Sequence, residues 1–594
     1  MVYNGTTQTV KGTTYYNLTS SAGTSATLGA ATTVNNNLSV TSGIFADGGF
    51  QITGNGTGTL NVANGATLQI GAGAANTETF PTLFTTANIS LGATSTVNYN
   101  STSAMTVAGS VTSVGPSTYG HLTLSGNSVK TASAAITIAG NLTVNAGTFA
   151  DGGNQITGNG SGTLQVAAGA TLQIGAGTAT ITTFPTLFIT TNITLGATST
   201  VIYNSTGAMA VAGSVSSIGP ATYGHLTLSG NSTKTAASAI TVAGNLTINA
   251  GTFADGGNTI TVNGNVTNNA THSGAGNIIL TGGSGAHAIS GTTSTFGTLI
   301  LNDATYGGTM TGSGTTTIGT LTVTAGTLTL NAFTTSLSVT TTNVTGTLTF
   351  NNATGTRLMG AVTVNTGGIV NVTLAQSTPL ITVSSLNING GTWNNTVVNE
   401  PVTISTGTFT NTGTFNSGTG AYTFSAATSS INGNATTFSS LTVNSTTGTT
   451  NNIIASGGLT VITTLAGSGI LIQAANANLN IGASTVTPTL TATATGNTVS
   501  YTGSGQTLKV TSYSNLTLSG GAETFGAITT IGGNLTLSGS ATATTGAALT
   551  IGGNLNVGDG TTFTAAAFAL TETGTTTIGG GSKREPYHII CHRS

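Results

Sequence analysis

Short runs of alternating apolar and polar residues fill this chain from near its beginning to about residue 580. Within Ala139–Gly147 and Gly162–Val166, the apolar residues Leu142, Val144, Leu164 and Val166 alternate with Asn, Thr and Gln. A period of two predicts β-strands with one buried face, and the Gly, Asn and Asp residues between the runs predict turns. No stretch combines an apolar spacing of 3.6 residues with helix caps, so we expect almost no helix.

The alternating runs are organised in long internal repeats. The motif Phe-Ala-Asp-Gly-Gly begins at Phe45, Phe149 and Phe253, at two successive intervals of 104 residues. A second motif, Tyr-Gly-His-Leu-Thr-Leu-Ser-Gly, begins at Tyr119 and Tyr223, again 104 residues apart. Looser copies of its aromatic start lie at Phe296, Phe438 and Tyr513. These motifs predict repeat units at about 14–117, 118–221, 222–294, 295–436, 437–511 and 512–581.

A repetitive body of this length predicts an all-β fold, namely an elongated right-handed parallel β-solenoid (β-helix) of stacked coils over residues 1–581. Each coil of a solenoid stacks on the preceding one, so the array can extend over hundreds of residues. Leu, Ile and Val would fill its interior, Thr, Ser and Asn would face water, and turn Asn residues could form ladders between coils. The structural alternative is a series of β-sandwich domains of roughly 100 residues. Few prolines and the lack of a tryptophan or cysteine pair in each unit make this alternative less favoured.

Charged side chains are scarce. The 594 residues include 8 Lys+Arg and 10 Asp+Glu, with a formal net charge of −2. Nucleic-acid binding needs clustered basic residues, so we expect no nucleic-acid partner. No apolar run approaches the roughly 20 residues of a membrane helix, so we expect no membrane segment in this chain. The first residues carry neither a basic nor an apolar region of a signal peptide, so no export signal is expected in this chain.

Residues 582–594 differ from the rest of the chain in composition. They contain the only cysteine and three of the eight basic residues. We expect an atypical, disordered tail. Zinc binding is the alternative for its spaced ligand types, which are His588, Cys591 and His592.

The Asp-Gly-Gly motifs are interpreted as structural turns. Asp can bond its own backbone two residues on, and Gly adopts positive φ without strain. The turn residues are Asp47, Gly48, Gly49, Asp151, Gly152, Gly153, Asp255, Gly256 and Gly257. Catalysis is the alternative for the three aspartates, but it would require three equivalent sites. We therefore predict no catalytic residue, no cofactor and no metal ligand.

Two further polar positions vary between repeats. His121 and His225 match each other, whereas Asn17 occupies the position in the first repeat. A partly exposed turn histidine is favoured over a metal ligand, because no second His, Cys or carboxylate lies nearby in the sequence. Glu78 becomes Thr182 one repeat later, so any role of Glu78 is local.

The recurring pattern Tyr-x-x-Leu-Thr-Leu-Ser-Gly, Gly-Asn-Leu-Thr-Val-Asn-Ala-Gly-Thr-Phe and Asp-Gly-Gly-Asn-x-Ile-Thr resembles the β-strand-repeat surface proteins of bacteria. These proteins include the passenger regions of autotransporter-like and filamentous-haemagglutinin-like adhesins. The resemblance covers about residues 10–580 and implies display on the bacterial cell surface as a stalk, adhesin or biofilm component. It implies as partners a host or neighbouring-cell surface, glycans or matrix, with possible self-association. Because the carboxylates are scattered along the sequence, we also expect that the chain is not an enzyme.

Two alternative functions remain open. A β-helix enzyme that processes polysaccharides would need clustered carboxylates, which adjacent coils could bring together. An ice-binding solenoid would need regular outward Thr-x-Thr pairs, and Thr327–Thr329 and Thr347–Thr349 have this pattern.

Overall fold

The protein is described by a computed structural model that covers residues 1–110, 115–214, 219–351, 355–373 and 381–580. In these residues 51% of positions are strands, which form parallel stacked sheets in a β-solenoid of about 27 turns. The helical elements described are two single 3₁₀ turns, η1 (Thr86–Asn88) and η2 (Thr190–Asn192). The predicted all-β parallel solenoid is confirmed, and the sandwich alternative is wrong. The handedness of the coil stays a prediction.

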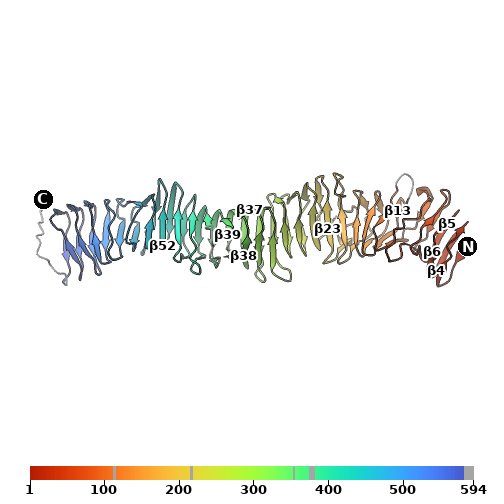
Figure 1. The fold of residues 1–594 in the computed structure, drawn as a ribbon, viewed down its shortest axis with the longest axis horizontal. Helices are drawn as coiled ribbons and strands as arrows, with labels where there is room; N and C mark the ends of the chain where they lie inside the picture. Colours follow the sequence, from red (N-terminus) through yellow and green to blue (C-terminus); the bar gives the residue numbers. More distant parts are fainter. Residues whose placement is uncertain (111–114, 215–218, 352–354, 374–380, 581–594) are drawn as a thin grey trace. The chain divides into compact units, whose positions relative to one another are not determined.

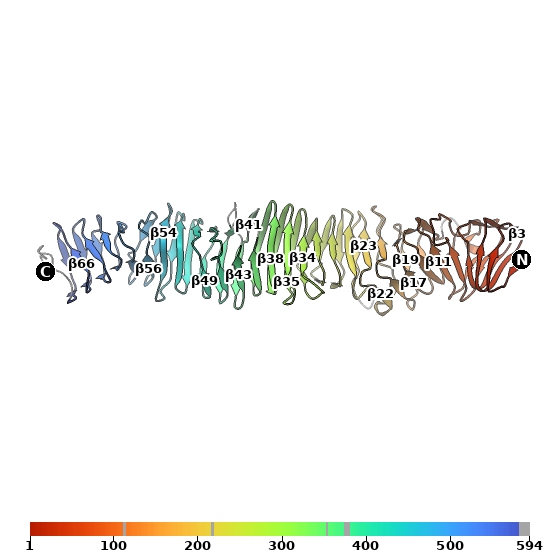
Figure 2. The ribbon, with the colours of Figure 1, turned by 60° about the horizontal axis from the view of Figure 1, so that its bottom comes forward.

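The chain divides into two compact units, Met1–Ile300 and Leu301–Ser594. Within each unit, successive strands lie side by side in the order of their coils (Figures 1 and 2). The repeat boundaries inferred from the sequence stay a prediction, and the tail 582–594 lies outside the described residues. None of the helices described is long and apolar enough to cross a membrane.

In the first unit, one buried column shows how the coils stack. It runs through β4 (Leu18–Leu28), β6 (Leu38–Ala46), β9 (Thr67–Ile70), β11 (Thr96–Asn100) and β14 (His121–Ser125). Its members, each fully buried and paired in register with the next, are Ala26, Phe45, Leu68, Val97 and Leu122. A coil therefore takes 19 to 29 residues here. Four coils separate the first member from the last.

The second repeat forms an equivalent column on the neighbouring side of the coil. It runs through β15 (Val129–Ala132), β18 (Thr148–Ala150), β21 (Thr171–Ile174), β23 (Thr200–Asn204) and β25 (His225–Ser229). Its members are Lys130, Phe149, Leu172, Val201 and Leu226, each 104 residues beyond a member of the first column.

Four coils span 96 residues in each of these columns, from position 26 to 122 and from 130 to 226. A repeat of 104 residues is thus eight residues longer than four coils. The equivalent strands β14 and β25 accordingly belong to different sheets, as do β12 (Met105–Val107) and β24 (Met209–Val211). Equivalent residues of consecutive repeats therefore face different sides of the solenoid.

The second unit has the same construction of inward apolar columns. β38 (Thr327–Phe333), β40 (Thr347–Phe350), β43 (Ile369–Val372) and β46 (Thr392–Asn394) pair in parallel. Their inward side chains form a buried column of Leu328, Leu348, Val370 and Trp393. Nearby, a cluster of aromatic rings packs with centroid distances of 4.9 to 6.4 Å between Phe409, Phe415, Tyr422, Phe424 and Phe438.

Asparagine ladders join the coils at their turns, as the sequence predicts. Asn515 Oδ1 accepts the backbone N–H of Asn534 at 2.9 Å, and Asn534 Oδ1 accepts that of Asn554 at 2.8 Å. In the first unit Asn245 Oδ1 accepts the N–H of Asn265 at 2.9 Å. These side chains satisfy turn amides that the strand ladders leave unpaired.

Candidate functional site

The Asp-Gly-Gly motifs form tight turns with the same geometry in all three repeats. The two glycines of each motif have φ between 63° and 83°. The backbone N–H of Phe50 donates to the carbonyl oxygen of Asp47 at 3.0 Å, which closes a four-residue turn. Two positive φ angles in its centre identify a type I′ turn, which needs glycine-like residues. Asp47 Oδ1 accepts the N–H groups of Gly49 and, from the next coil, Gly71, both at 2.9 Å.

The aspartate of each turn meets a different partner. Asp151 Oδ2 accepts the hydroxyl of Thr182 at 2.6 Å. Asp47 instead faces Glu78, which occupies the position of Thr182 in the preceding repeat. Burial raises the pKa of Asp47 to about 6, the N–H groups of the turn and the next coil oppose this shift, and the charge of Glu78 adds to it.

The third aspartate pairs with a histidine. His272 Nε2 lies 3.1 Å from Asp255 Oδ2, and both side chains are fully buried. The N–H of Gly297 donates to His272 Nδ1 at 3.3 Å, so the ring hydrogen is on Nε2 and faces the carboxylate. Burial lowers the pKa of His272 and Asp255 opposes that shift. The pair is closed to substrates, because no atom of either side chain reaches solvent.

Most carboxylates of the described residues are inside the solenoid. Six are at most 4% exposed, namely Asp47, Asp151, Asp255, Asp303, Glu400 and Glu523. Glu78 and Glu572 are partly exposed, and Asp559 is exposed. A polymeric substrate would therefore meet few carboxylates on this surface.

The basic residues follow the same trend, which the sequence analysis missed. Lys130, Lys234 and Arg357 are fully buried. Lys130 Nζ donates to the carbonyl oxygen of Ser101 and to Ser128 Oγ, both at 2.9 Å, and to the carbonyl oxygen of Gly126. Three acceptors match the three N–H groups of an ammonium ion. Burial nevertheless lowers the pKa of Lys130 to about 8.

Lys234 has an equivalent cage one repeat later. Its Nζ donates to the carbonyl oxygens of Ser205 and Gly230 and to Ser232 Oγ. Burial lowers its pKa to about 8 as well. The signal for both lysines was present in the sequence, because each occupies an inward position of an alternating run.

His121 and His225 lie at the first residue of β14 and β25, not in turns. The prediction of a turn position was therefore wrong, whereas their partial exposure is confirmed. Each Nδ1 accepts a backbone N–H from the next coil, that of Asn141 or Asn245, at 2.8 Å. In the described residues no group of three or more His, Cys, Asp and Glu side chains could hold a metal ion. His588, Cys591 and His592 lie outside them.

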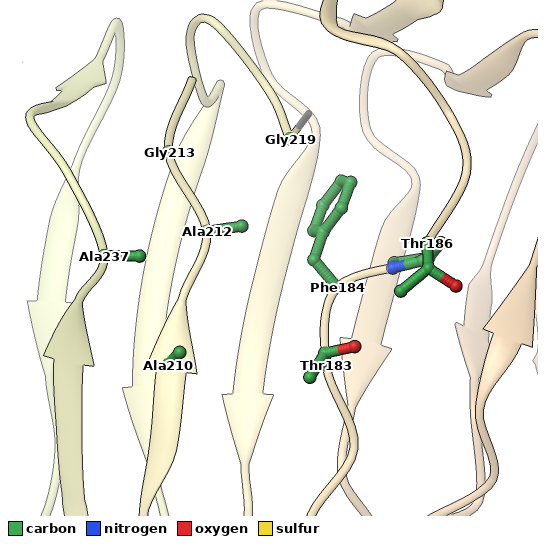
Figure 3. A pocket seen from close by; sticks show the side chains of 9 residues that line it. Thr183, Phe184, Thr186, Ala210, Ala212, Gly213, Gly219 and Ala237 are labelled. Atoms are coloured by element: carbon green, nitrogen blue, oxygen red, sulfur yellow. The ribbon is translucent and has the colours of Figure 1, made fainter. Parts of the chain in front are cut away.

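A pocket of about 300 Å³ opens in the first unit (Figure 3). One wall is the segment after β21, with Phe184 and Pro185. The opposite wall consists of Ala210 on β24, Ala212, and Ala237 after β26 (Thr233–Ala236). In Figure 3 the Phe184 ring lies between these walls, and Ala212 points toward it.

The lining of this pocket is apolar and uncharged. Its two threonine hydroxyls have partners elsewhere: Thr183 Oγ1 donates to Gln155 Oε1 at 2.9 Å, and Thr186 Oγ1 to Thr157 Oγ1 at 3.3 Å. None of the described residues that line the pocket has an ionisable side chain. The pocket can therefore hold an apolar group.

The Thr-x-Thr pairs stack over two coils. Thr327 pairs with Thr347, and Thr329 with Thr349. On the following coil the corresponding residues are Ile369 and Asn371. A second stack, Thr542–Thr544 on Thr562–Thr564, also comprises two coils, since the coil before it presents Ala522. The regular lattice that ice binding requires is therefore interrupted at both places.

No protein-family model, curated protein or solved structure matches this chain. The resemblance to bacterial β-strand-repeat surface proteins accordingly stays a prediction.

Proposed function

We propose that this chain is an extracellular structural and adhesive protein of a bacterial surface, a repetitive stalk or adhesin passenger that mediates attachment of cells to surfaces or in biofilms. Its partners in this proposal are neutral glycans of a host cell, a neighbouring cell or the matrix. The observation that carries the proposal is the near absence of charge on a solenoid surface made of Thr, Ser and Asn.

Burial of charge supports an uncharged partner. Three of the basic side chains and six carboxylates lie inside the solenoid. Electrostatic steering toward anionic polymers needs a concentrated field of one sign on the surface. Outward columns such as Thr403, Thr423 and Thr442 present hydroxyl groups instead. Hydroxyl and amide groups can form hydrogen bonds with the hydroxyl groups of neutral sugars.

The experiment is a bead-adhesion assay with the purified chain on neutral polysaccharide, heparin and a cationic polymer. We expect attachment to the neutral polysaccharide that is unchanged between about 0.05 M and about 1 M salt, because screening weakens only charge interactions. Attachment restricted to the charged polymers, or loss of attachment in high salt, would contradict the proposal.

The same assay distinguishes the polysaccharide-processing alternative. An enzyme would release reducing ends from the immobilised glycan over time, and substitution of Glu78 or Glu572 by Gln would slow that release. We expect no release of reducing ends by the wild-type chain. Release that depends on either carboxylate would replace the adhesive proposal by an enzymatic one.

A further inference from the structure

Side-chain acceptors that precede inward Leu residues join neighbouring coils in the first unit. Asn17 Oδ1 accepts the backbone N–H of Asn37, and Asn141 Oδ1 accepts that of Thr163, both at 3.0 Å. The amide oxygen of asparagine is an acceptor at any pH that proteins normally meet. These links are therefore insensitive to acid.

Histidine replaces asparagine at the equivalent position of the next two repeats. His121 stands where the first repeat has Asn17, and its Nδ1 accepts the N–H of Asn141 at 2.8 Å. His225 makes the same contact with Asn245 at 2.8 Å. A neutral imidazole can accept at only one ring nitrogen, so both rings carry their hydrogen on Nε2. A protonated imidazole carries hydrogen on both nitrogens and has no acceptor left.

Glycine provides the space for these contacts. A Cβ atom added at Gly140 or Gly244 would overlap the imidazole of His121 or His225. Neither glycine has a positive φ, so close approach of the ring, not backbone conformation, is what requires glycine. Each ring thus lies directly against the next coil, whose backbone N–H donates to it.

No charged side chain lies on the strands that pack against either histidine strand. β14 is flanked by β11 and β17 (Leu142–Val144), and β25 by β23 and β28 (Leu246–Ile248). The titratable groups on these neighbours are Tyr99 and Tyr203, which are fully buried and bonded to Tyr119 and Tyr223. A protonated ring at His121 or His225 has no carboxylate on these strands to compensate the lost bond.

The other described histidines are arranged differently. His287 Nδ1 lies 2.7 Å from the carbonyl oxygen of Gly264, a contact that a protonated ring keeps. His272 faces Asp255, which would stabilise a protonated ring. His121 and His225 therefore differ from His287 in accepting at Nδ1, and from His272 in having no carboxylate on the strands that flank them.

We propose that His121 and His225 are acid-sensitive links between neighbouring coils, which open locally when the imidazole is protonated. At neutral pH each ring joins its coil to the next through the Asn141 or Asn245 amide. In acid the two coils separate at each ring, while the equivalent asparagine link of the first repeat stays closed. The strand ladders on either side confine the opening to these two positions.

Hydrogen exchange of the purified chain between about pH 8 and about pH 5, the range in which histidine titrates, tests this proposal. Peptides that contain Asn141 and Asn245 are compared with the peptide that contains Asn37, after correction for the intrinsic pH dependence of exchange. Loss of one hydrogen bond predicts a rise in the opening equilibrium of roughly 2- to 12-fold in acid at Asn141 and Asn245. No change is expected at Asn37.

Two variants at each site make the test specific. His121→Asn with His225→Asn copies Asn17 and should abolish the acid response while keeping neutral protection. His121→Leu with His225→Leu lacks an acceptor and should exchange fast at both pH values; if it fails to fold, the asparagine variant still decides. An acid response that persists in the asparagine variant, or is absent from the wild type, would overturn the proposal.

Discussion

At the scale of single residues, hydrogen bonds satisfy the buried charges of Lys130 and Asp47. The ammonium of Lys130 has three oxygen acceptors, and each turn aspartate accepts N–H groups from two coils. A buried charge is tolerable when its hydrogen-bonding capacity is filled, and removal of one partner is costly. The energetic role of these residues can therefore be tested by exchanging them between repeats.

Replacement of Lys130 by Met removes the donor for three oxygens. We expect Lys130→Met to lower the free energy of unfolding at pH 7 by about 1–3 kcal/mol, because the carbonyls of Ser101 and Gly126 are left without that donor. Lys11→Met, at an exposed position, is the control and should change stability little. Urea unfolding followed by circular dichroism measures both. If Lys130→Met and Lys11→Met lowered the free energy of unfolding equally, the hydrogen bonds of Lys130 would not be the cause.

The lowered pKa of Lys130 and Lys234 also predicts a pH dependence. The folded pKa is about 8 and the ordinary value is 10.5, so above pH 8 the folded state binds fewer protons than the unfolded state. Stability of the wild type should therefore rise as pH increases from about 8 to about 10.5. A variant with both lysines replaced by Met should lack this rise when its urea midpoint is measured over the same range.

The pair of Asp47 and Glu78 predicts the opposite trend. The pKa of Asp47 is about 6 when folded and 3.8 ordinarily, so the folded state binds more protons between these values. Its contribution to stability is greatest in acid and falls by up to about 3 kcal/mol as pH rises through 6. Glu78→Thr copies Thr182 and should stabilise the chain at pH 7 by about 1–2 kcal/mol, through a hydroxyl bond to the carboxylate.

The reciprocal exchange is the control for Glu78→Thr. Thr182→Glu removes the hydroxyl that donates to Asp151 and adds a negative charge beside it, so it should destabilise the chain at pH 7. Both variants are measured by urea unfolding at pH 4 and pH 7. If Glu78→Thr stabilises equally at both pH values, the carboxyl pair is not the cause.

At the scale of elements, paired tyrosines join segments that no strand ladder connects. Tyr99 and Tyr119 share a hydroxyl–hydroxyl bond of 3.0 Å. Tyr99 accepts the N–H of Ala108 at 3.0 Å, and Tyr119 donates to the carbonyl oxygen of the same residue at 2.5 Å. Three further tyrosine pairs hold a residue in the same way, and we term this arrangement the tyrosine clamp. Tyr3 and Tyr15 hold Lys11, Tyr203 and Tyr223 hold Ala212, and Tyr501 and Tyr513 hold Lys509.

The clamp explains the aromatic start of the recurring sequence motif. Tyr119→Phe keeps the ring but removes the donor to a buried carbonyl, so we expect a loss of about 1–3 kcal/mol. Tyr16→Phe is the control, because Tyr16 is 71% exposed. Thermal unfolding of both variants measures the difference. Phe296 and Phe438, which occupy the corresponding motif position elsewhere, show that the motif tolerates a ring without the hydroxyl.

At the scale of the whole molecule, the mismatch between repeat and coil determines what the surface presents. Because 104 residues exceed four coils by eight, equivalent loops of consecutive repeats in the first unit face neighbouring sides. The turn at Asp47 therefore does not stack on the turn at Asp151. A flat face with one motif in register cannot arise from repeats of this length, which weakens the ice-binding alternative.

Deletions test this relation between repeat and coil. Removal of 118–221 deletes one whole repeat and joins residue 117 to residue 222, which is equivalent to residue 118. Each coil then still stacks on a coil equivalent to its native neighbour. We expect an unchanged midpoint of thermal unfolding, since solenoid stability is a sum over neighbouring units. Removal of 26–121 deletes four whole coils, but it creates new neighbours and should lower the midpoint. A lower midpoint for the 118–221 deletion than for the 26–121 deletion would contradict this relation between repeat and coil.

The sequence by itself determined the class of fold, the turns and the ladders, because these depend on local patterns. The alternation at Leu142 and Val144 identifies a half-buried strand wherever that strand lies in space. Glycines with positive φ and asparagine acceptors likewise act within a turn or between neighbouring coils.

Only the tertiary structure decided which side of the solenoid each residue occupies and what it meets there. Coils vary from 17 to 29 residues in the first unit, so a strand's partner cannot be read from sequence spacing alone. The cage of Lys130, the partner of Tyr119 and the pocket beside Phe184 all depend on that pairing. Each brings together residues from different coils, and such contacts are set by how the coils stack and not by any local pattern.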